Sequence, residues 1–395
     1  MSDRSRQPSG LSKTILQFQQ KFTTVVTPFV EKTFNIKRGV MTGRERATRA
    51  IEFKGPDMIP HQTRDFMLMS YVPPQSWQPP EGYYPYVQPE FVKYGLWKWE
   101  KRKDKGWLKE TRTAIDEFGT VWRIGPQTGS GQTVKGALED GWHLLDGYNL
   151  PDTKDWDRYK KVAGWIRRIG GTRYVLGIDN NSIWERFRFL RGFENAMTDL
   201  VLHPEEVKVL LGMLTDMTLD VIDSFKKTGA HGFMLLDDWG TQVRSFISPR
   251  HFEEFFLPCY SRITARCHEQ GMHCGMHSCG NISALVPLLI GSGLDFLQID
   301  SPDMCGVDWL SENAAGKICL ACSVDIQNVF PTNNPVLIES YIKDMIKKLG
   351  NHNGGMMAWP YYEAWVIGVG YRAHRLEYKL FEKYGKYPLD LSKLQ

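Results

Sequence analysis

Residues 232–281 read GFMLLDDWGTQVRSFISPRHFEEFFLPCYSRITARCHEQGMHCGMHSCGN, in which two short apolar runs flank a longer periodic segment. The runs at 232–240 and 273–281 are mainly apolar and end in polar residues, as strands of a buried parallel sheet do. Residues 249–270 repeat apolar side chains at helical spacing, and Ser248 before a proline is a favourable helix start. This stretch predicts a strand–helix–strand unit of an α/β protein.

The same alternation recurs along the chain. Further apolar strands are predicted at 172–180, 294–301, 317–325 and 354–360, and another amphipathic helix at 205–228. One more strand at 57–62 and a candidate within 111–125, which also reads as a β-hairpin turning at Glu117–Gly119, bring the number close to eight. We therefore predict a (β/α)8 TIM-type barrel. An open doubly wound sheet is the alternative, but no GxGxxG motif follows a first strand.

The predicted barrel domain spans residues 41–395 and opens with a helix whose N-cap is Thr42, followed three residues later by Glu45. Residues 1–40 are polar with scattered apolar positions and are predicted to form an N-terminal helical extension. Residues 71–99 are rich in proline and aromatic side chains, and we expect an ordered loop there because free linkers carry little aromatic area.

Composition narrows the function classes. The 395 residues are 42% hydrophobic and 24% charged, as in ordinary globular proteins. The net charge of +4 is spread along the chain and argues against nucleic-acid binding. No apolar run approaches the roughly 20 residues of a membrane helix, and the N-terminus has no secretory pattern, so we predict a cytoplasmic protein. All seven cysteines lie between Cys259 and Cys322, which favours metal or catalytic use of one or two over disulfides.

The strongest candidate for chemistry is the pair His277 and Cys279. Residues two apart on a strand point to the same face, so both side chains can reach one ion at the end of a barrel strand. Imidazole and thiolate are ordinary zinc ligands. The alternative is a core cysteine beside a polar histidine. Asp237 and Asp238 end the preceding strand and face opposite sides, so at most one enters the barrel mouth. That one could be a metal ligand, a base or a substrate anchor; a turn cap is the alternative.

Several motifs in a fixed order resemble the uroporphyrinogen decarboxylase-like superfamily. They are DDxGxQ (237–242), SPRHFEEF (248–255), HSCGN (277–281), GSGLDFLQ (291–298), SVDIQNVFP (323–331) and NGGMMAWP (353–360). The resemblance runs from about residue 41 to near the C-terminus, and it implies a (β/α)8-type barrel. Each motif alone is unspecific, whereas their order is specific.

This superfamily contains two chemistries. Its metal-free decarboxylases hold a tetrapyrrole through an early motif resembling RQAGR, where this chain has HQTRD (61–65). Its methyltransferases move methyl groups to or from a corrinoid on a partner protein, and hold zinc with a His-x-Cys pair and a later cysteine. His277 and Cys279 match the pair, but Tyr362 stands where the later cysteine would be. The third ligand is then Glu363, one of Asp237 and Asp238, or Cys322, and we predict the carboxylate of Glu363.

The resemblance therefore implies a zinc-dependent methyltransferase that passes a methyl group from a small methylated substrate to the cobalt(I) corrinoid (cobalamin type) of a partner protein. An oxygen ligand would make the zinc more Lewis-acidic, which favours O-demethylation of a methoxylated compound. The predicted proton donors are Asp238, His61 and Tyr362. The predicted substrate-binding residues are Arg64, Asp237, Gln242, Asp325 and Tyr361.

Two other functions stay open at this point. One is a metal-free decarboxylase of the uroporphyrinogen type, which would require arginines such as Arg64, Arg123 and Arg244 to converge in the mouth. The other is a binding protein without catalytic activity on the same barrel. The sequence also leaves open a homodimer in which residues 1–40 pack on the second subunit.

Overall fold

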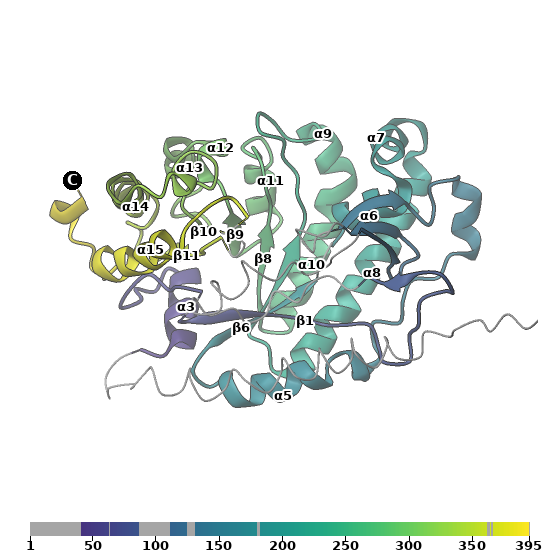
Figure 1. Ribbon diagram of the computed structural model, residues 1–395, viewed down its shortest axis with the longest axis horizontal. Coiled ribbons are helices and arrows are strands. Elements are labelled where there is room, and N and C mark those ends of the chain that lie inside the picture. The colour runs from purple at the N-terminus through teal and green to yellow at the C-terminus, as the bar shows by residue number, and fades with distance from the viewer. Residues whose placement is uncertain are drawn as a thin grey trace, which may run out of the picture. The chain divides into compact units, whose positions relative to one another are not determined.

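The main element of the computed structural model is a parallel sheet of seven strands in the order β1-β6-β7-β8-β9-β10-β11 (Figure 1). The structure describes residues 41–62, 64–86, 111–124, 131–179, 182–361, 364 and 366–394. The seven strands are β1 (Phe66–Ser70), β6 (Tyr174–Asp179), β7 (Gly232–Leu236), β8 (His273–His277), β9 (Phe296–Ile299), β10 (Cys319–Cys322) and β11 (Met356–Ala358). Each strand from β6 onward coincides with a predicted apolar run. The predicted strand–helix alternation is thereby confirmed.

The eighth barrel position is occupied by an extended segment and not by a regular strand. The predicted strand at 57–62 makes only isolated bridges, one of them a parallel bridge between His61 and Ala358 of β11. Ala358 N–H donates to the Pro60 carbonyl at 2.8 Å, and Gln62 N–H donates to the Ala358 carbonyl at 3.1 Å. The regular strand is β1, which follows this segment and pairs with β6. Residues 60–62 thus pair with β11 at one edge of the sheet, and β1, which pairs with β6, forms the other edge, which closes the sheet as a (β/α)8-type barrel requires.

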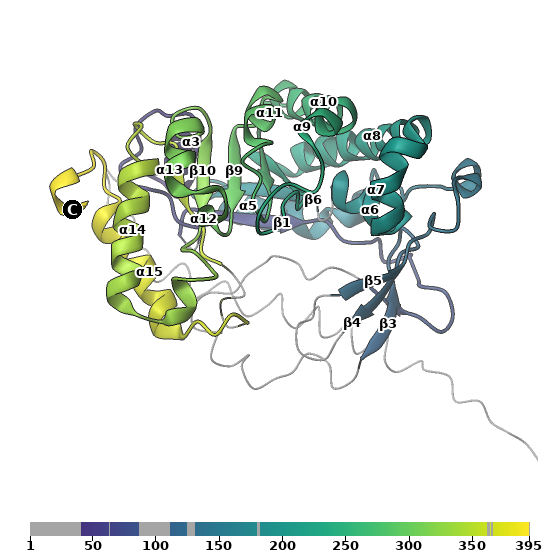
Figure 2. The same cartoon turned by 90° about the horizontal axis from the view of Figure 1, so that it is seen from above.

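Residues 111–125 do not supply a barrel strand. β3 (Arg112–Ile115) and β4 (Val121–Ile124) form the predicted antiparallel hairpin, whose turn is held by Asp116 Oδ1 accepting from the Phe118 and Thr120 amides at 3.0 and 2.9 Å. With β2 (Tyr84–Pro85) and β5 (Gly131–Lys135) they make a separate four-stranded sheet (Figure 2). The hairpin prediction is thus confirmed, and the barrel-strand alternative for this segment is wrong.

Side chains along each barrel strand alternate between the barrel interior and the surrounding helix layer. The interior cluster contains Phe66, Leu68, Tyr174, Leu176, Ile178, Met234, Phe296, Cys319, Ala321, Met357 and Trp359. The side chains between them, such as Phe233 and Leu235 of β7 or Cys274 and Met276 of β8, pack with the helices. Ala47, Ala50 and Ile51 of helix α3 (Gly43–Ile51) belong to the interior cluster and cover the amino-terminal end of the barrel.

Helices cover the outside of the sheet. Besides α3 they are α5 (Lys160–Ile169), α6 (Trp184–Arg191), α7 (Phe193–Leu202), α8 (Pro204–Thr228), α9 (Pro249–His251), α10 (Leu257–Glu269), α11 (Val286–Gly291), α12 (Pro302–Cys305), α13 (Val307–Asn313), α14 (Pro335–Leu349) and α15 (Tyr371–Tyr384). Short helical segments span Trp142–Gly147, Trp156–Arg158, Phe252–Phe256, Phe330–Thr332 and Leu391–Leu394. The predicted helices at 205–228 and 249–270 appear as α8 and as the continuous run from α9 to α10.

The predicted helix starts are also present. Thr42 accepts from the Glu45 amide at 3.1 Å, and Ser248 accepts from the His251 amide at 3.2 Å. None of the helices that the structure describes is long and apolar enough to cross a membrane. The predicted extension at 1–40 and residues 87–99 of the predicted aromatic loop lie outside the described residues.

Glu377 on α15 is a buried acid with a measurable consequence for stability. Its side chain is fully buried and has no ion-pair partner among the described residues. Burial raises the pKa of Glu377 to about 8, opposed in part by a hydrogen bond from the Val324 backbone. The unfolded chain releases this proton near pH 4.3. The native state therefore holds one more proton between about pH 4 and 8, and the free energy of unfolding falls as the pH rises through that range.

Glu377→Gln is expected to remove this contribution. Between pH 5 and 7 the wild-type protein should lose about 2–3 kcal/mol of unfolding free energy through this group, and the variant should not. Urea unfolding at the two pH values measures the difference. Glu312→Gln, at an exposed glutamate, is the matched control and should keep the wild-type slope. An unchanged slope in Glu377→Gln would contradict the assignment.

Candidate metal centre

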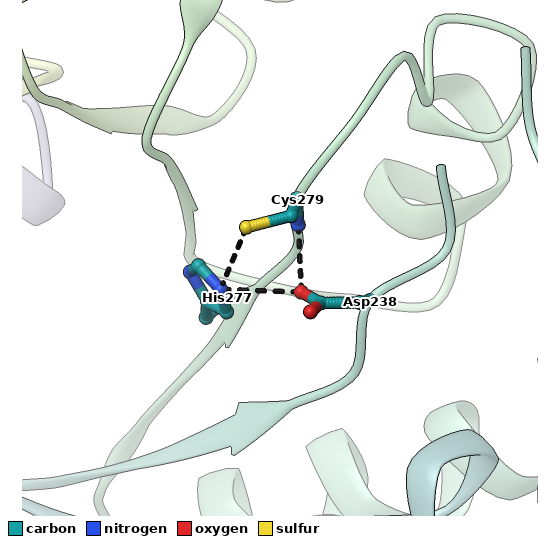
Figure 3. A group of neighbouring side chains, drawn as sticks. All are labelled: Asp238, His277 and Cys279. Carbon is teal, nitrogen blue, oxygen red and sulfur yellow. Dashed lines mark hydrogen bonds and ion pairs between the residues drawn. The ribbon is translucent and has the colours of Figure 1, made fainter. Parts of the chain in front are cut away.

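Asp238, His277 and Cys279 converge at the carboxyl ends of two neighbouring strands. His277 ends β8 and Cys279 follows it, while Asp238 follows β7, which pairs with β8 (Figure 3). His277 Nε2 lies 3.2 Å from Asp238 Oδ1 and 3.4 Å from Cys279 Sγ. One ligand atom from each of the three lies within 4.8 Å of the others. Among the residues that the structure describes, no other three His, Cys, Asp or Glu side chains meet this criterion.

The strand alternation explains why these three side chains meet. Met234 and Leu236 of β7 point into the barrel, so Asp238, two residues further on, points the same way. On β8 the outward residues are Cys274 and Met276, which leaves His277 on the inner face. Cys279 lies two residues beyond His277 and shares that face.

Backbone contacts hold the two strand ends together. The Cys279 N–H donates to Asp238 Oδ1 at 2.9 Å, and the Gly240 N–H donates to the Cys279 carbonyl at 3.0 Å. Gly280 has φ +85°, and a Cβ built on it would lie 2.2 Å from the backbone carbonyl of Gly240. A glycine at position 280 therefore allows the loop after β8 to approach the loop after β7 closely enough for Asp238 and Cys279 to share a site.

The three groups stabilise one another electrostatically. Burial raises the pKa of Asp238, but the charge and hydrogen bond of His277 and the Cys279 amide lower it to about 2. Burial lowers the pKa of His277, but Cys279, Asp238 and Asp300 hold it well above its ordinary value. Burial raises the pKa of Cys279 to about 12 against the opposing charge of His277. These shifts favour a carboxylate–imidazolium pair beside a neutral thiol when no metal ion is bound.

The donor set fits zinc. Imidazole nitrogen, thiolate sulfur and carboxylate oxygen are its ordinary protein ligands, and catalytic zinc sites typically have three protein ligands and one open position. The proton on His277 Nε2 and the thiol proton would have to leave when a metal ion binds. The geometry therefore offers a three-ligand site at the barrel mouth.

The third member of the site is one of the alternatives that the sequence left open for the third ligand. Glu363, the predicted carboxylate ligand, and Tyr362, a predicted proton donor, lie outside the described residues. Cys322 is fully buried on the outer face of β10 and packs with the helix layer, so it cannot reach the mouth. Asp238 supplies the carboxylate that meets His277 and Cys279. The pKa of Asp238 is held near 2 by His277 and the Cys279 amide, which favours a role as ligand. Proton donation by Asp238 stays a prediction.

Comparisons with known proteins agree with this fold. Residues 182–357, which include all three site residues, match the model of the family described as Uroporphyrinogen decarboxylase (URO-D). A uroporphyrinogen decarboxylase of Xanthomonas euvesicatoria pv. vesicatoria (strain 85-10) is 26% identical over 163 residues, covering 38% of this chain and 42% of that protein. A solved methyltransferase from Methanosarcina mazei has a TM-score of 0.60 at 11% identity, covering 87% of this chain and 99% of that one. The predicted resemblance to the uroporphyrinogen decarboxylase-like proteins is confirmed.

A methyltransferase also occurs among the sequence relatives of this chain. A methylated-thiol–coenzyme M methyltransferase of Methanosarcina mazei is 23% identical over 221 residues, covering 56% of this chain and 51% of that protein. The chain spans about half the length of the curated relatives that it matches. Both chemistries implied by the sequence resemblance are thus represented among the relatives.

Asp237 does not contact the mouth of the barrel. Its side chain is fully buried on the outer face of the strand end. Its carboxylate accepts from the Ile183 amide at 3.1 Å, the Glu185 amide at 2.9 Å and Tyr260 Oη at 2.8 Å. These donors come from the start of α6 and from α10, so Asp237 ties two helices to β7. The predicted substrate-binding role of Asp237 is therefore wrong.

His61 and Arg64 both contact residues of α15. His61 is buried, and its ring packs edge-on against Tyr378 of α15 with centroids 4.9 Å apart. Burial holds the pKa of His61 well below its ordinary value. Proton donation by His61 stays a prediction. Arg64 makes ion pairs with Asp65 at 2.7 Å and Glu382 at 3.2 Å, which occupy the guanidinium that was predicted to bind substrate.

Three predicted substrate-binding residues remain: Asp325, Gln242 and Tyr361. Asp325 is buried and accepts from Ser301 Oγ at 2.6 Å and from the Asn328 amide at 2.9 Å, so it caps a turn and does not bind substrate as predicted. Gln242 is exposed on the loop after β7. Tyr361 is half-buried against the helix-layer core. Substrate binding by Gln242 and Tyr361 stays a prediction.

Two further polar side chains, Gln298 and Asp300, lie at the site although the sequence did not predict a role for either of them. Gln298 lies in β9 directly beside His277 in the parallel register. Its Oε1 contacts His277 Nδ1, and its Nε2 donates to Asp300 Oδ1 at 2.7 Å. Asp300 Oδ2 also lies 3.9 Å from Cys279 Sγ. The available signal was a glutamine inside the otherwise apolar run FLQI (296–299), which is unusual for a fully buried strand.

Proposed function

We propose that this protein is a zinc-dependent methyltransferase that transfers a methyl group from a small methylated substrate to the cobalt(I) corrinoid of a partner protein. The observation that carries the proposal is the convergence of Asp238, His277 and Cys279 at the carboxyl ends of β7 and β8. This is the end of a barrel at which TIM-type enzymes place their active sites. The methyltransferase among the sequence relatives supports the same reaction class.

A zinc ion held by these three residues would supply Lewis-acid activation of the atom that leaves with the electrons of the methyl bond. Asp238 contributes an oxygen donor where the resembling methyltransferases use a second thiolate. That choice favours activation of an ether oxygen over a thiol, so a methoxylated compound is the preferred substrate class. The remaining donors come from His277 and Cys279, and the backbone contacts of Cys279 and Gly240 keep the set assembled before substrate arrives.

The barrel interior beneath the site is apolar. Phe296 and Trp359 are buried in the interior cluster, and the ring of Trp359 lies 5.0 Å from that of Phe66 between centroids. Such a floor keeps water away from the reacting face of a bound substrate, which strengthens electrostatic interactions there. It also suits the methyl group and any aromatic ring that carries it.

The decarboxylase alternative is less well supported. It requires arginines that converge on the substrate's carboxylates, yet Arg64 is engaged by Asp65 and Glu382. Arg123 is exposed on β4 of the separate four-stranded sheet, and Arg244 is exposed on the loop after β7. The decarboxylase reading predicts activity without metal, which separates it from the proposal.

The test compares the wild-type protein with a His277→Ala/Cys279→Ala double variant. The wild type is expected to retain about one zinc per chain after dialysis, and the double variant is expected to retain none, by elemental analysis. His268→Ala, which removes an exposed histidine paired with Asp295, is the matched control and should keep the metal.

The activity is then followed with anisole or methoxybenzoate and free cob(I)alamin. The methyl–oxygen bond breaks, a cobalt–carbon bond forms, and the phenolate leaves and takes up a proton. Methylcobalamin should appear in the absorption spectrum with wild type and not with the double variant. Zinc-free wild type that decarboxylates a tetrapyrrole would establish the alternative. Protein with neither metal nor activity would favour the binding-protein function.

A further inference from the structure

Gln298 is a buried amide that makes two directed contacts beside the proposed metal centre. It is 2% exposed and lies on the inner face of β9, in register with His277 on β8. Its neighbours Leu297 and Ile299 face the helix layer. Burying an amide in such a strand costs free energy unless both ends are hydrogen-bonded. Here His277 contacts the oxygen end and Asp300 the nitrogen end.

The direction of these hydrogen bonds determines which nitrogen of His277 is free for a metal ion. The Gln298 nitrogen faces Asp300 and donates to its Oδ1 at 2.7 Å. The amide oxygen then faces His277 Nδ1, and it only accepts hydrogen bonds. Nδ1 must therefore hold a proton, which leaves Nε2 as the ligand atom. Nε2 is the nitrogen that lies 3.2 Å from Asp238 Oδ1 and 3.4 Å from Cys279 Sγ.

We infer that Gln298, held by Asp300, is a positioning residue that fixes the ring of His277 with Nδ1 protonated and Nε2 directed at the metal. This inference rests on the proposed metal centre. It extends that proposal by assigning a role to two residues that are not ligands themselves. Asp300, Gln298 and His277 form a chain of hydrogen bonds in which Asp300 orients Gln298 and Gln298 orients His277. Partners of this kind raise metal affinity by reducing the freedom of the ligand ring.

The first experiment measures zinc affinity by competition with a chromophoric chelator. Gln298→Leu removes the acceptor while keeping a side chain of similar size, and it is expected to weaken zinc binding roughly 10–100-fold. Gln270→Leu is the matched control, because Gln270 also donates to a carboxylate, that of Asp223 at 2.9 Å, but at a distance from the site. The control should bind zinc like wild type.

The second experiment identifies the ligating nitrogen. In zinc-loaded wild type, nitrogen-15 NMR of the histidine rings should show His277 bound through Nε2 with a proton on Nδ1. Gln298→Glu keeps an acceptor for that proton, so it should keep Nε2 ligation and most of the affinity. Gln298→Glu can also be compared with wild type if the Gln298→Leu variant fails to fold. If Gln298 only filled space in the barrel, the Glu and Leu variants would not differ in zinc affinity and in the ligating nitrogen.

The outcomes separate the two proposals. Wild type that binds no zinc would overturn the metal centre and this inference with it. Wild type that binds zinc, with Gln298→Leu within twofold of it, would overturn this inference alone. Ligation through Nδ1 in the wild type would do the same. Weakened binding in Gln298→Leu with retained Nε2 ligation in Gln298→Glu is the supporting result.

Discussion

Asp238→Ala is expected to lose zinc while the protein stays folded. Asp238 is one of three proposed ligands, so its removal should weaken zinc binding by more than the roughly 100-fold upper range for residues that only support a ligand. Methyl transfer to cob(I)alamin should disappear with the metal. The side chain is 42% exposed and accepts from one backbone amide, that of Cys279, beside its ion pair with His277. Loss of this one acceptor should lower the free energy of unfolding by about 1–3 kcal/mol.

Asp237→Ala, one residue away, is expected to give the opposite pattern. It leaves the Ile183 amide, the Glu185 amide and the Tyr260 hydroxyl buried without their acceptor. Each buried donor left unpaired costs about 1–3 kcal/mol, so a loss of about 3 kcal/mol or more is expected. Metal affinity of the folded fraction should stay near wild type.

Paired measurements on the two variants decide the assignment. Chelator competition reports the zinc affinity, and urea unfolding of the metal-free proteins reports stability without any contribution from bound zinc. If Asp238→Ala kept wild-type affinity while Asp237→Ala lost it, the assignment of inner and outer carboxylates would be reversed. If neither lost affinity, a carboxylate outside the described residues, such as the predicted Glu363, would become the leading candidate.

The aspartate pair also shows how far the sequence can predict this site. The alternation of apolar runs and helical segments was sufficient for the parallel sheet, because both faces of such a sheet must be buried, in a barrel by its own interior side chains and by the outer helices. For the same reason, the strands are apolar on both faces, and their pattern does not indicate which face is inside. The prediction that only one aspartate enters the mouth follows from strand geometry alone. Which one enters depends on the packing of β7 against α6 and α10.

The errors have a related cause. Arg64 and Asp325 are polar residues at or near strand ends, and the sequence contains no sign that their partners lie on other elements. Arg64 is paired with Glu382, which is 318 residues away. Gln298 was missed because one amide in an apolar run gains significance only when its neighbour across the sheet is known to be His277. Contacts between adjacent strands that are distant in sequence are the information a single sequence lacks.

Gly280→Ala is expected to damage both the fold and the site. At φ +85° an alanine is strained by about 1–2 kcal/mol. Its Cβ would also lie 2.2 Å from the carbonyl carbon and oxygen of Gly240, which are backbone atoms and cannot rotate away. The loops after β7 and β8 would have to separate. We expect a loss of about 3–5 kcal/mol of unfolding free energy.

The separation should reach the metal centre directly, because Gly280 follows Cys279 and faces the loop that follows Asp238. Zinc binding by the folded protein should weaken at least tenfold, as measured by chelator competition below the unfolding transition. Gly212→Ala, inside α8 with no atom within 4 Å of the added Cβ, is the matched control. It should stabilise the protein by about 0.5–1 kcal/mol, because alanine is favoured over glycine within a helix, and leave zinc affinity unchanged. Wild-type stability and zinc affinity in Gly280→Ala would show that the close approach of the two loops is not what assembles the site.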